Sequence, residues 1–352
     1  MTTATPQTAD QPEPTTDLLA WLCCPRCRAD LQPDGDVWYR CAGCGRRYPI
    51  VLGIPDLRIC SDPYVTFEQD HEKGREVAEQ ASRLGFAELL EFYWERVSKP
   101  PTPLDLRRRF IRHVLEDEER VAHLPIAHER GRALLDVGCG ASAMPVVAAR
   151  GFHTVFATDV AFRWLVLQRK RLAEAGVTPH VVCCCADHLP FHEETFDQVT
   201  AIAVLEHVRD ARAVVAECAR VLAPGGSFFA STTNRFSLAA EPHVGIWGLG
   251  FLPRRWTAPV AAWLRGRPYG PHHLLSLFEL RRLLAGVGLS RMEFSLPVIR
   301  DADLLERGRL ERAGARAFRA VSGWAPLRPL LRAVSPVVQV VAARERGTEA
   351  GA

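Results

Sequence analysis

The chain has 352 residues, of which 47% are hydrophobic and 24% charged, and its formal net charge is +3. This length exceeds one typical domain and suffices to bury a full core. A net charge this small does not by itself indicate a nucleic-acid partner. No run of 18 apolar residues occurs, which argues against a membrane-spanning helix.

The first 17 residues are rich in Thr, Pro and Gln and contain no apolar stretch. They lack the positive start and the apolar core that define a signal peptide. We therefore expect a disordered leader over residues 1–17 and a cytoplasmic protein. Residues 346–352 are expected to form a short tail.

Two C-x-x-C pairs, separated by 13 residues, follow the leader: Cys24 with Cys27, and Cys41 with Cys44. Each pair can place two thiolates on one tight turn, and two such turns facing each other form a tetrahedral zinc site. Four protein ligands leave no open position, so this zinc would be structural. A pair of disulfides is the alternative, which a cytoplasmic setting disfavours. We expect a zinc-ribbon domain over residues 18–60.

The sequence pattern of residues 61–130 predicts a helical linker or cap. Residues 88–94 have helical periodicity, and the proline-rich run at 99–103 interrupts the segment. These helices either cap a ligand site in the following domain or only bury their own apolar faces. The sequence does not separate these two roles.

A buried strand and a glycine-rich turn occupy residues 134–142. Glycines at such a turn let a ligand approach the backbone, and the first N–H groups of the next helix then face it. Nineteen residues after Gly140, a second apolar strand ends in Asp159, at the distance where an acid binds a ribose diol. A third strand ends in Asp187, and a fourth runs from 196 to 203. The pattern predicts an α/β fold.

At this point the chain resembles the class I S-adenosylmethionine-dependent methyltransferases. Five strings in the family's order and spacing, over residues 131–235, carry the resemblance: LLDVGCGAS, FATD, CADHLPFHEETFD, AVLEHVRD and RVLAPGGSFFASTTN. Five motifs in register are specific where one would not be. The resemblance implies a Rossmann-like, seven-stranded sheet, and we expect the methyltransferase domain to extend over residues 131–345.

The resemblance also implies which residues hold the cofactor, S-adenosylmethionine. They are Asp136, Gly138, Gly140, Asp159, Ala186 and Asp187. The first three would line its methionine moiety, the fourth would bind the ribose hydroxyls, and the last two would meet the adenine amine. The chain departs from the family at Ser142, where a third glycine is frequent, and we expect a slightly altered turn there.

Glu206 and His207 directly follow the fourth strand, at the sheet edge where ligands bind. A histidine titrates near neutrality and suits a general base that takes a proton from an acceptor hydroxyl. We therefore predict His207, with Glu206 beside it, as the catalytic pair. Two alternatives stay open. The pair could hold a divalent metal, as the similar LEHV string is thought to do in some ubiquinone-biosynthesis O-methyltransferases, or His207 could only cap or pack a helix.

An insertion at about residues 235–275 is predicted to select the substrate. Four aromatic residues lie beside arginines in it, as in an amphipathic lid: Trp247, Trp256, Trp263 and Tyr269. Through residues 247–269 this lid would make a peripheral membrane contact; the alternative is a helical lid over a soluble small molecule. Three of its histidines are second-choice acid–base residues: His243, His272 and His273.

The segments after the lid are expected to complete the sheet. Residues 276–289 predict an amphipathic helix, and residues 290–300 and 336–341 predict the last two strands. Between these strands, residues 306–320 predict an arginine-rich helix with a solvated face.

The ribbon also resembles a known family. Residues 22–57, LCCPRCRADLQPDGDVWYRCAGCGRRYPIVLGIPDL, are similar to the small zinc-ribbon activator proteins that bind tRNA and protein methyltransferases as a separate subunit. Here the ribbon is fused ahead of the catalytic domain. We expect it to pack on the chain's own methyltransferase domain through the apolar runs at 48–51 and 54–55.

The sequence therefore predicts a methyltransferase that uses S-adenosylmethionine and carries a fused structural zinc ribbon. The expected acceptor is an oxygen on a small-molecule or lipid-like metabolite. One alternative is an RNA or protein methyltransferase whose ribbon recognises the target, although the ribbon has no basic–aromatic strip that gives a strong nucleic-acid signal. The other alternative is a non-catalytic S-adenosylmethionine-binding scaffold.

Overall fold

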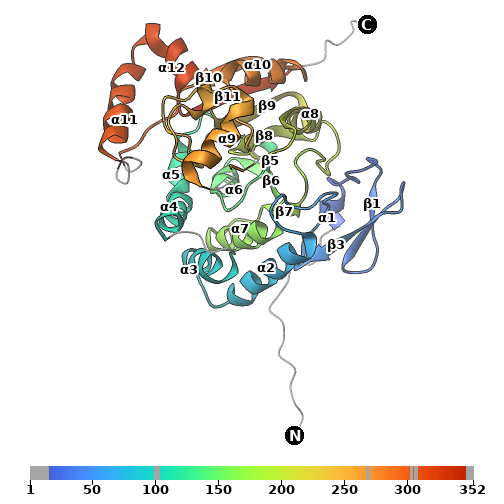
Figure 1. Cartoon of the computed structure of the whole chain (residues 1–352). Helices are drawn as coiled ribbons and strands as arrows, with labels where there is room; N and C mark the ends of the chain where they lie inside the picture. The colour runs from blue at the N-terminus through green and yellow to red at the C-terminus, as the bar shows by residue number, and fades with distance from the viewer. Residues whose placement is uncertain are drawn as a thin grey trace, which may run out of the picture.

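The computed structural model describes residues 16–98, 104–266, 269–270, 272–301, 304 and 308–345. Most of the leader expected at 1–17, and the tail expected at 346–352, lie outside the described residues. Within the described part, no helix is long and apolar enough to cross a membrane. Figure 1 shows a large central sheet with helices around it and a small sheet near the N-terminal end.

The central sheet has seven strands in the order β10-β11-β9-β8-β5-β6-β7. The strands are β5 (Gly131–Val137), β6 (Phe152–Asp159), β7 (His180–Cys183), β8 (Phe196–Ile202), β9 (Leu222–Thr233), β10 (Leu289–Ser295) and β11 (Val337–Arg344). The pairs from β9 to β7 are parallel, whereas β11 is antiparallel to both of its neighbours. This confirms the Rossmann-like, seven-stranded sheet.

Helices cover both faces of this sheet, because its central strands carry apolar side chains on both sides. On one face lie α6 (Met144–Ala148) and α7 (Phe162–Glu174), and on the other α8 (Ala211–Val221) and α10 (Leu277–Ala285). Successive β5 residues divide between the faces: Leu134 joins the apolar cluster of Met144, and Leu135 joins that of Val215.

Four helices and a π-helix fill most of the segment expected to be helical at 61–130. They are α2 (Phe67–Gln80), α3 (Phe86–Phe92), the π-helix at Tyr93–Val97, α4 (Leu104–Leu115) and α5 (Asp117–Ala122). Helix α2 packs directly on α7. Gly74 allows this close approach, because a Cβ atom there would lie only 2.6 Å from the ring of Phe162.

The small sheet belongs to the ribbon and follows the short helix α1 (Thr16–Leu19). Its strands are β1 (Leu31–Pro33), β2 (Trp38–Cys41), β3 (Arg47–Val51) and β4 (Ile54–Pro55), each antiparallel to the next. Gly35 makes the β1–β2 turn with a φ of +71°, a conformation that favours glycine.

The ribbon covers a part of the large sheet that has no helix of its own. The connection from β7 to β8 contains no helix, although parallel strands are usually joined by one. In its place, Leu22 forms a β-bridge with Phe191. The ring centroid of Trp21 lies 5.4 Å from that of Phe156 and 6.1 Å from that of Phe196. The N-terminal segment thus takes the position of a crossover helix.

The segments expected to contact the methyltransferase domain do so, together with one that was not expected. Tyr48 belongs to the same apolar cluster as the sheet, and Ile54 to the cluster that contains Phe162 of α7. In addition, Arg28 places Nη2 at 2.7 Å from Glu217 of α8. The ribbon and the sheet therefore share one continuous apolar core.

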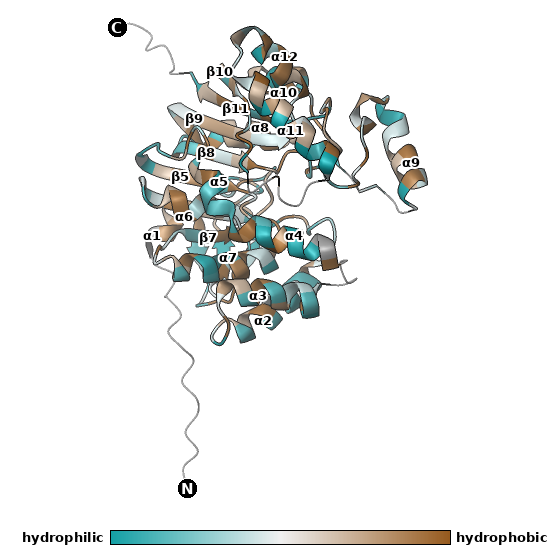
Figure 2. Cartoon of the chain, turned by 90° about the vertical axis from the view of Figure 1, so that its left-hand side faces the viewer, coloured by the Kyte–Doolittle hydropathy of each residue, from teal (hydrophilic) through white to brown (hydrophobic). Residues whose placement is uncertain are grey.

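The lid and the C-terminal region complete the molecule. The lid contains a 3-10 turn (Leu249–Phe251) and α9 (Arg254–Arg265), and Figure 2 shows α9 standing apart from the sheet at the edge of the molecule. After β10 come α11 (Arg309–Ser322), a 3-10 turn (Ala325–Leu327) and α12 (Arg328–Val334). The helix expected from residue 306 begins at 309 in the structure, and residue 306 itself lies outside the described residues.

Candidate active site

The topology identifies the edge of the sheet where ligands bind. From β5 the chain proceeds outward to β6 and β7 and then returns to β8 on the opposite side of β5. Open α/β sheets bind ligands at this reversal, beyond the carboxyl ends of the strands. Asp136 and Gly138 lie at the end of β5, and Glu206 and His207 follow β8. The predicted cofactor residues and the predicted catalytic pair therefore lie at the same edge.

The glycine-rich turn after β5 is tied to the end of β6. The N–H of Gly140 donates to Oδ2 of Asp159 at 2.8 Å, and the N–H of Ala161 donates to Oδ1 at 2.8 Å. Burial raises the pKa of Asp159, and these two hydrogen bonds oppose the rise. Each carboxylate oxygen has a further lone pair, so a ribose diol can still donate to Asp159.

Asp136 offers a partner for a cationic ligand. Its side chain is buried, and Thr200 donates a hydrogen bond to Oδ1 at 2.6 Å. Oδ2 is buried and has no hydrogen-bond partner among the described residues. Burial raises the pKa of Asp136 to about 7. An ammonium group such as that of a methionine moiety would supply the missing partner, and the space where Gly140 would carry a Cβ is open.

Ala186 and Asp187 lie just beyond β7, at the adenine end of the expected cofactor site. Asp187 is half-buried, and its carboxylate groups with the thiols of Cys60 and Cys185 within 4.8 Å of one another. The two sulfur atoms are 2.8 Å apart. Cys60 is the last residue of the segment expected to form the ribbon, so a thiol at the end of the ribbon adjoins this end of the site.

A buried arginine that sequence reasoning missed joins the ribbon to the cofactor edge. The Arg58 side chain is 0% exposed, and its guanidinium donates to both carboxylate oxygens of Asp56, at 2.8 Å and 2.6 Å. It also donates to Asp70 at 2.7 Å and to the carbonyl of Val160 at 2.8 Å. Val160 directly follows Asp159, so Arg58 holds the loop that carries the expected ribose-binding acid.

Asp70 of α2 extends this ion-pair network to the start of α7. It accepts the N–H of Phe162 at 2.7 Å and the guanidinium of Arg163 at 2.7 Å. An acid at this position accepts a hydrogen bond from a free N–H in the first turn of α7, and its negative charge is stabilised by the helix dipole. No local motif signals this contact, because the two helices are about 90 residues apart in the sequence.

The two members of the predicted catalytic pair have different environments. Glu206 is buried. Its carboxylate accepts a hydrogen bond from the hydroxyl of Thr232 at 2.7 Å. It also accepts hydrogen bonds from the N–H and the hydroxyl of Thr233, at 3.2 Å and 3.0 Å. Its backbone carbonyl accepts the N–H of His273 at 2.8 Å. Glu206 thus joins β9 and the lid to the loop that presents His207.

His207 meets two of the lid histidines that were second choices from the sequence. Its ring centroid is 5.1 Å from that of His243 and 5.1 Å from that of His272, and the latter two rings stack at 3.9 Å. Burial lowers the pKa of His207. Burial, and then the neighbouring histidines, lower the pKa of His272 to about 4. Both imidazoles are therefore neutral near pH 7 and can accept a proton or bind a metal.

The four predicted zinc ligands lie together in the ribbon. The thiols of Cys24, Cys27, Cys41 and Cys44 are all within 4.8 Å of one another. The sulfur of Cys24 lies 3.8 Å from that of Cys44, and the sulfur of Cys27 lies 3.3 Å from that of Cys41. Zinc–sulfur bonds of about 2.3 Å in a tetrahedron would separate the sulfurs by about 3.8 Å, so the cluster fits the ion.

One thiol of the cysteine cluster has hydrogen-bond donors that favour its thiolate form. Burial opposes ionisation of Cys24, but a hydrogen bond from the Tyr48 hydroxyl at 3.2 Å and nearby backbone N–H groups lower its pKa to about 7. Thiolates are the form that binds zinc. The ribbon is therefore suited to a structural zinc ion.

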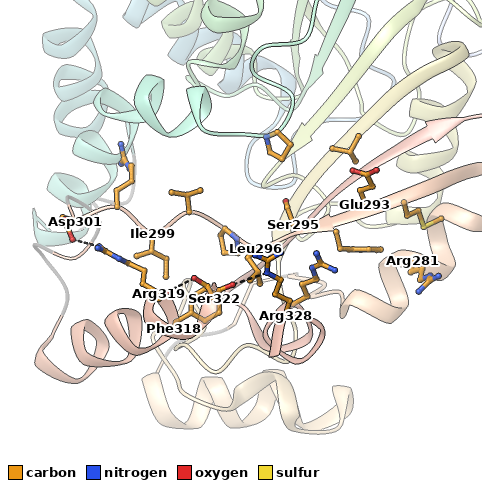
Figure 3. A pocket seen from close by; sticks show the side chains of 18 residues that line it. Arg281, Glu293, Ser295, Leu296, Ile299, Asp301, Phe318, Arg319, Ser322 and Arg328 are labelled. Carbon is orange, nitrogen blue, oxygen red and sulfur yellow. Dashed lines mark hydrogen bonds and ion pairs between the residues drawn. The ribbon is translucent and has the colours of Figure 1, made fainter. Parts of the chain in front are cut away.

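A separate cavity of about 1100 Å³ lies between β10 and the helices α11 and α12 (Figure 3). Arg281, Arg319 and Arg328 line it together with Glu293 and Phe318. The predicted cofactor and catalytic residues do not line it. The cavity is thus distinct from the ligand edge formed by β5 and β8.

Comparison with known proteins finds a family match for the segment that contains the central motifs. Residues 135–230 match the methyltransferase domain family. The ubiquinone biosynthesis O-methyltransferase of Salmonella arizonae is 38% identical over 106 residues, which cover 30% of this chain and 44% of the relative. The Salmonella typhimurium enzyme is 37% identical over a segment of the same extent. The chain thus spans less than half the length of the curated relatives it matches.

Solved structures of low sequence identity resemble the chain. The [4+2]-cyclase SpnF is 17% identical with a TM-score of 0.45, over 79% of this chain and 97% of that one. Phosphoethanolamine N-methyltransferase 2 of Haemonchus contortus is 16% identical with a TM-score of 0.41, over 76% of this chain and 60% of that one. The family match over residues 135–230 and the sheet order agree with the resemblance inferred from the five strings.

Proposed function

We propose that the protein transfers the methyl group of S-adenosylmethionine to an oxygen of a small-molecule or lipid-like acceptor. The observation that carries this proposal is the meeting of two sets of groups at one sheet edge. Asp136 and Asp159 offer acceptors for an ammonium group and a ribose diol, and His207 stands beyond the neighbouring strand. The curated relatives are O-methyltransferases, which supports an oxygen acceptor.

The chain's own residues would bind the cofactor, orient the acceptor and deprotonate the acceptor hydroxyl. When bound, S-adenosylmethionine would supply an activated methyl group on a sulfonium. Alignment of the reactants can lower the barrier by about 7–11 kcal/mol. His207 would take the hydroxyl proton of the acceptor, since burial keeps its imidazole neutral. Glu206 would act indirectly, by holding this loop against Thr232 and Thr233.

A substitution of His207 tests this assignment. His207→Ala should retain affinity for S-adenosylmethionine and reduce kcat by about 10²–10⁴-fold, the usual contribution of a general base. His153→Ala is the matched control, because His153 is exposed at the start of β6, away from the carboxyl edge. Unchanged kcat in His207→Ala would exclude this residue from proton transfer.

The acceptor class can be found with methyl-labelled S-adenosylmethionine and an extract of the host. We expect label in the small-molecule or organic-soluble fraction. Label in RNA or protein would instead support target recognition by the ribbon, which the packing of Trp21 and Leu22 on the sheet does not favour. Cofactor binding without label in any fraction would favour a non-catalytic scaffold.

We also propose that the lid makes a peripheral membrane contact through the described part of residues 247–269. Trp263 of α9 is 82% exposed, and Trp247 and Trp256 are each more than half exposed. Arginines such as Arg254 flank them, as in helices that lie at a lipid surface. Sedimentation with vesicles of anionic lipid should carry the wild type down and leave Trp256→Ser/Trp263→Ser in solution. Equal recovery of both proteins would contradict the membrane contact.

The ribbon is proposed to bind one structural zinc ion through its four cysteines. We further propose a cytoplasmic location, because clustered thiols that bind zinc persist in a reducing compartment. Elemental analysis of the purified protein would test the metal content directly. A zinc-free, fully folded chain would contradict this part of the proposal.

A further inference from the structure

The edge of the active site carries a cluster of three histidines: His207, His243 and His272. Each comes from a different segment, yet one nitrogen of each lies within 4.8 Å of the others. Three imidazoles are a common ligand set for transition metals. This cluster is separate from the four cysteines of the ribbon.

One nitrogen of the cluster is unpaired, and another is held by a carboxylate. Nδ1 of His272 is buried without a hydrogen-bond partner in the described part of the chain. Nδ1 of His243 is hydrogen-bonded to Glu241, which leaves its Nε2 as a lone-pair donor. A buried polar atom without a partner carries a free-energy cost, so an additional group in the cluster would relieve it.

Glu241 adds the kind of outer contact that metal-binding histidines have. Its carboxylate is buried and also accepts the N–H groups of His243 at 2.9 Å and Val244 at 2.8 Å. A carboxylate that fixes one ring nitrogen orients the other nitrogen toward a metal and raises its basicity.

The present ring positions require one adjustment. The rings of His243 and His272 stack at 3.9 Å with an interplanar angle of 18°. A bound ion lies in the plane of each imidazole that binds it, so one of the two rings must turn out of the stack. Residue 270 is a glycine, and a Cβ there would already lie 3.0 Å from Nε2 of His272. The absence of a side chain at residue 270 leaves space for this turn.

We propose that His207, His243 and His272 bind one divalent transition-metal ion, such as Zn²⁺, Co²⁺ or Fe²⁺, at the acceptor end of the active site. Imidazole nitrogen suits these ions better than Mg²⁺, which prefers oxygen ligands. Three protein ligands leave an open position for a further ligand. Glu206 is not one of the ligands, because Thr232 and Thr233 occupy its carboxylate.

The role of the ion rests on the proposed function. An acceptor hydroxyl at the open position would lose its proton to solvent more readily, since the ion stabilises the resulting oxyanion. The oxygen–carbon bond to the methyl group then forms as the sulfonium–carbon bond breaks. The products are a methyl ether, a neutral thioether and the released proton. With the ion bound, His207 acts as a metal ligand in place of the general-base role given to it above, and His243 and His272 are equally necessary.

Metal content of the full-length protein tests the site without reference to activity. After loading with Zn²⁺ and removal of free ion, the wild type should hold two ions per chain. His243→Ala and His272→Ala should each hold one. His273→Ala is the matched control and should hold two, because its exposed side chain lies outside the cluster and only its backbone N–H contacts Glu206.

Co²⁺ separates the two sites spectroscopically. A Co²⁺ ion at the cysteines gives an intense sulfur-to-metal charge-transfer band. A second Co²⁺ ion at the histidines should bind without increasing this band. The melting temperature of each variant checks that it has folded. One Zn²⁺ per chain in the wild type, or two in the folded His243→Ala and His272→Ala variants, would overturn the site. A chain that holds two ions but transfers no methyl group would contradict the proposed function alone.

Discussion

The cysteine cluster of the ribbon and the histidine cluster of the lid differ in construction. The cysteines lie on two tight turns within a small sheet, and two of them are buried in the core that the ribbon shares with the large sheet. The histidines come from one loop and two places in the lid, and all three are half-buried at a ligand edge. Four ligands close a site and stabilise a fold, whereas three leave a position for chemistry. Removing a ligand should therefore affect folding in one region and reaction in the other.

The largest effect is expected when the cysteine cluster is broken. In Cys24→Ser, zinc loss should unfold the ribbon, because structural zinc contributes about 10–16 kcal/mol to small zinc domains. Since Leu22 and Tyr48 pack in the core of the large sheet, the whole chain should lose solubility or melt at a much lower temperature. Thermal unfolding followed by circular dichroism measures this. Cys60→Ser is the control, because Cys60 is exposed and lies outside the cluster, and it should melt like the wild type.

The next effect tests whether the ribbon acts on the cofactor edge. Arg58→Met removes the cation between two buried acids, Asp56 and Asp70, and should reduce the free energy of unfolding by about 3–5 kcal/mol. Affinity for S-adenosylmethionine should fall as well, because Val160 loses its contact. Chemical denaturation and calorimetry measure these quantities. Arg40→Ala breaks only an exposed pair with Asp34 and should change stability by less than about 1 kcal/mol.

A smaller effect, measured here on ligand binding, is expected at the end of β6. Asp159→Ala loses its hydrogen bonds to Gly140 and Ala161 together with the proposed ribose contact. A charge-assisted hydrogen bond contributes about 1.5–3 kcal/mol, so affinity for S-adenosylmethionine should fall about 10- to 100-fold or more. Metal content should remain that of the wild type. Calorimetric affinity equal to that of Asp36→Ala, an exposed ribbon control, would contradict the assignment.

The last effect, which is small over any one pH unit, is a change in the pH dependence of stability without ligand. Burial raises the pKa of Asp136 to about 7, so the folded state binds more protons than the unfolded state between about pH 4 and pH 7. Stability should therefore fall as pH rises through this window, by at most about 1.4 kcal/mol per pH unit from this residue. Asp136→Asn should remove that contribution. Parallel denaturation curves of variant and wild type across the window would show that Asp136 does not titrate there.

Much of the fold follows from local patterns, because the pairs of cysteines and the strand–turn motifs act over a few residues. Asp136 and Asp159 could be proposed as cofactor residues from the motifs around them, and the strand order confirms the architecture. The grouping of His243 and His272 with His207 could not, because it depends on how the lid folds back over the sheet.

Arg58 illustrates a second limit of local patterns. Its partners lie 2, 12 and 102 residues away, and only the nearest could be suspected from spacing. The ribbon's position on the sheet is similar. It depends on the connection from β7 to β8, which contains no helix. The sequence of that connection does not indicate that the segment around Leu22 packs there instead.

The pairing of the ribbon with β7 has a consequence for self-association. β7 is the last strand of the sheet, and Leu57 donates its N–H to the carbonyl of Cys183 at 2.8 Å beside the bridge from Asp56. At the other margin, β10 carries a register shift and the exposed charges Arg291 and Glu293. Unprotected margins recruit strands from other molecules. Because the ribbon is covalently fused, it covers the edge of β7 at every protein concentration. A ribbon on a separate subunit would dissociate on dilution and leave this strand edge exposed to aggregation.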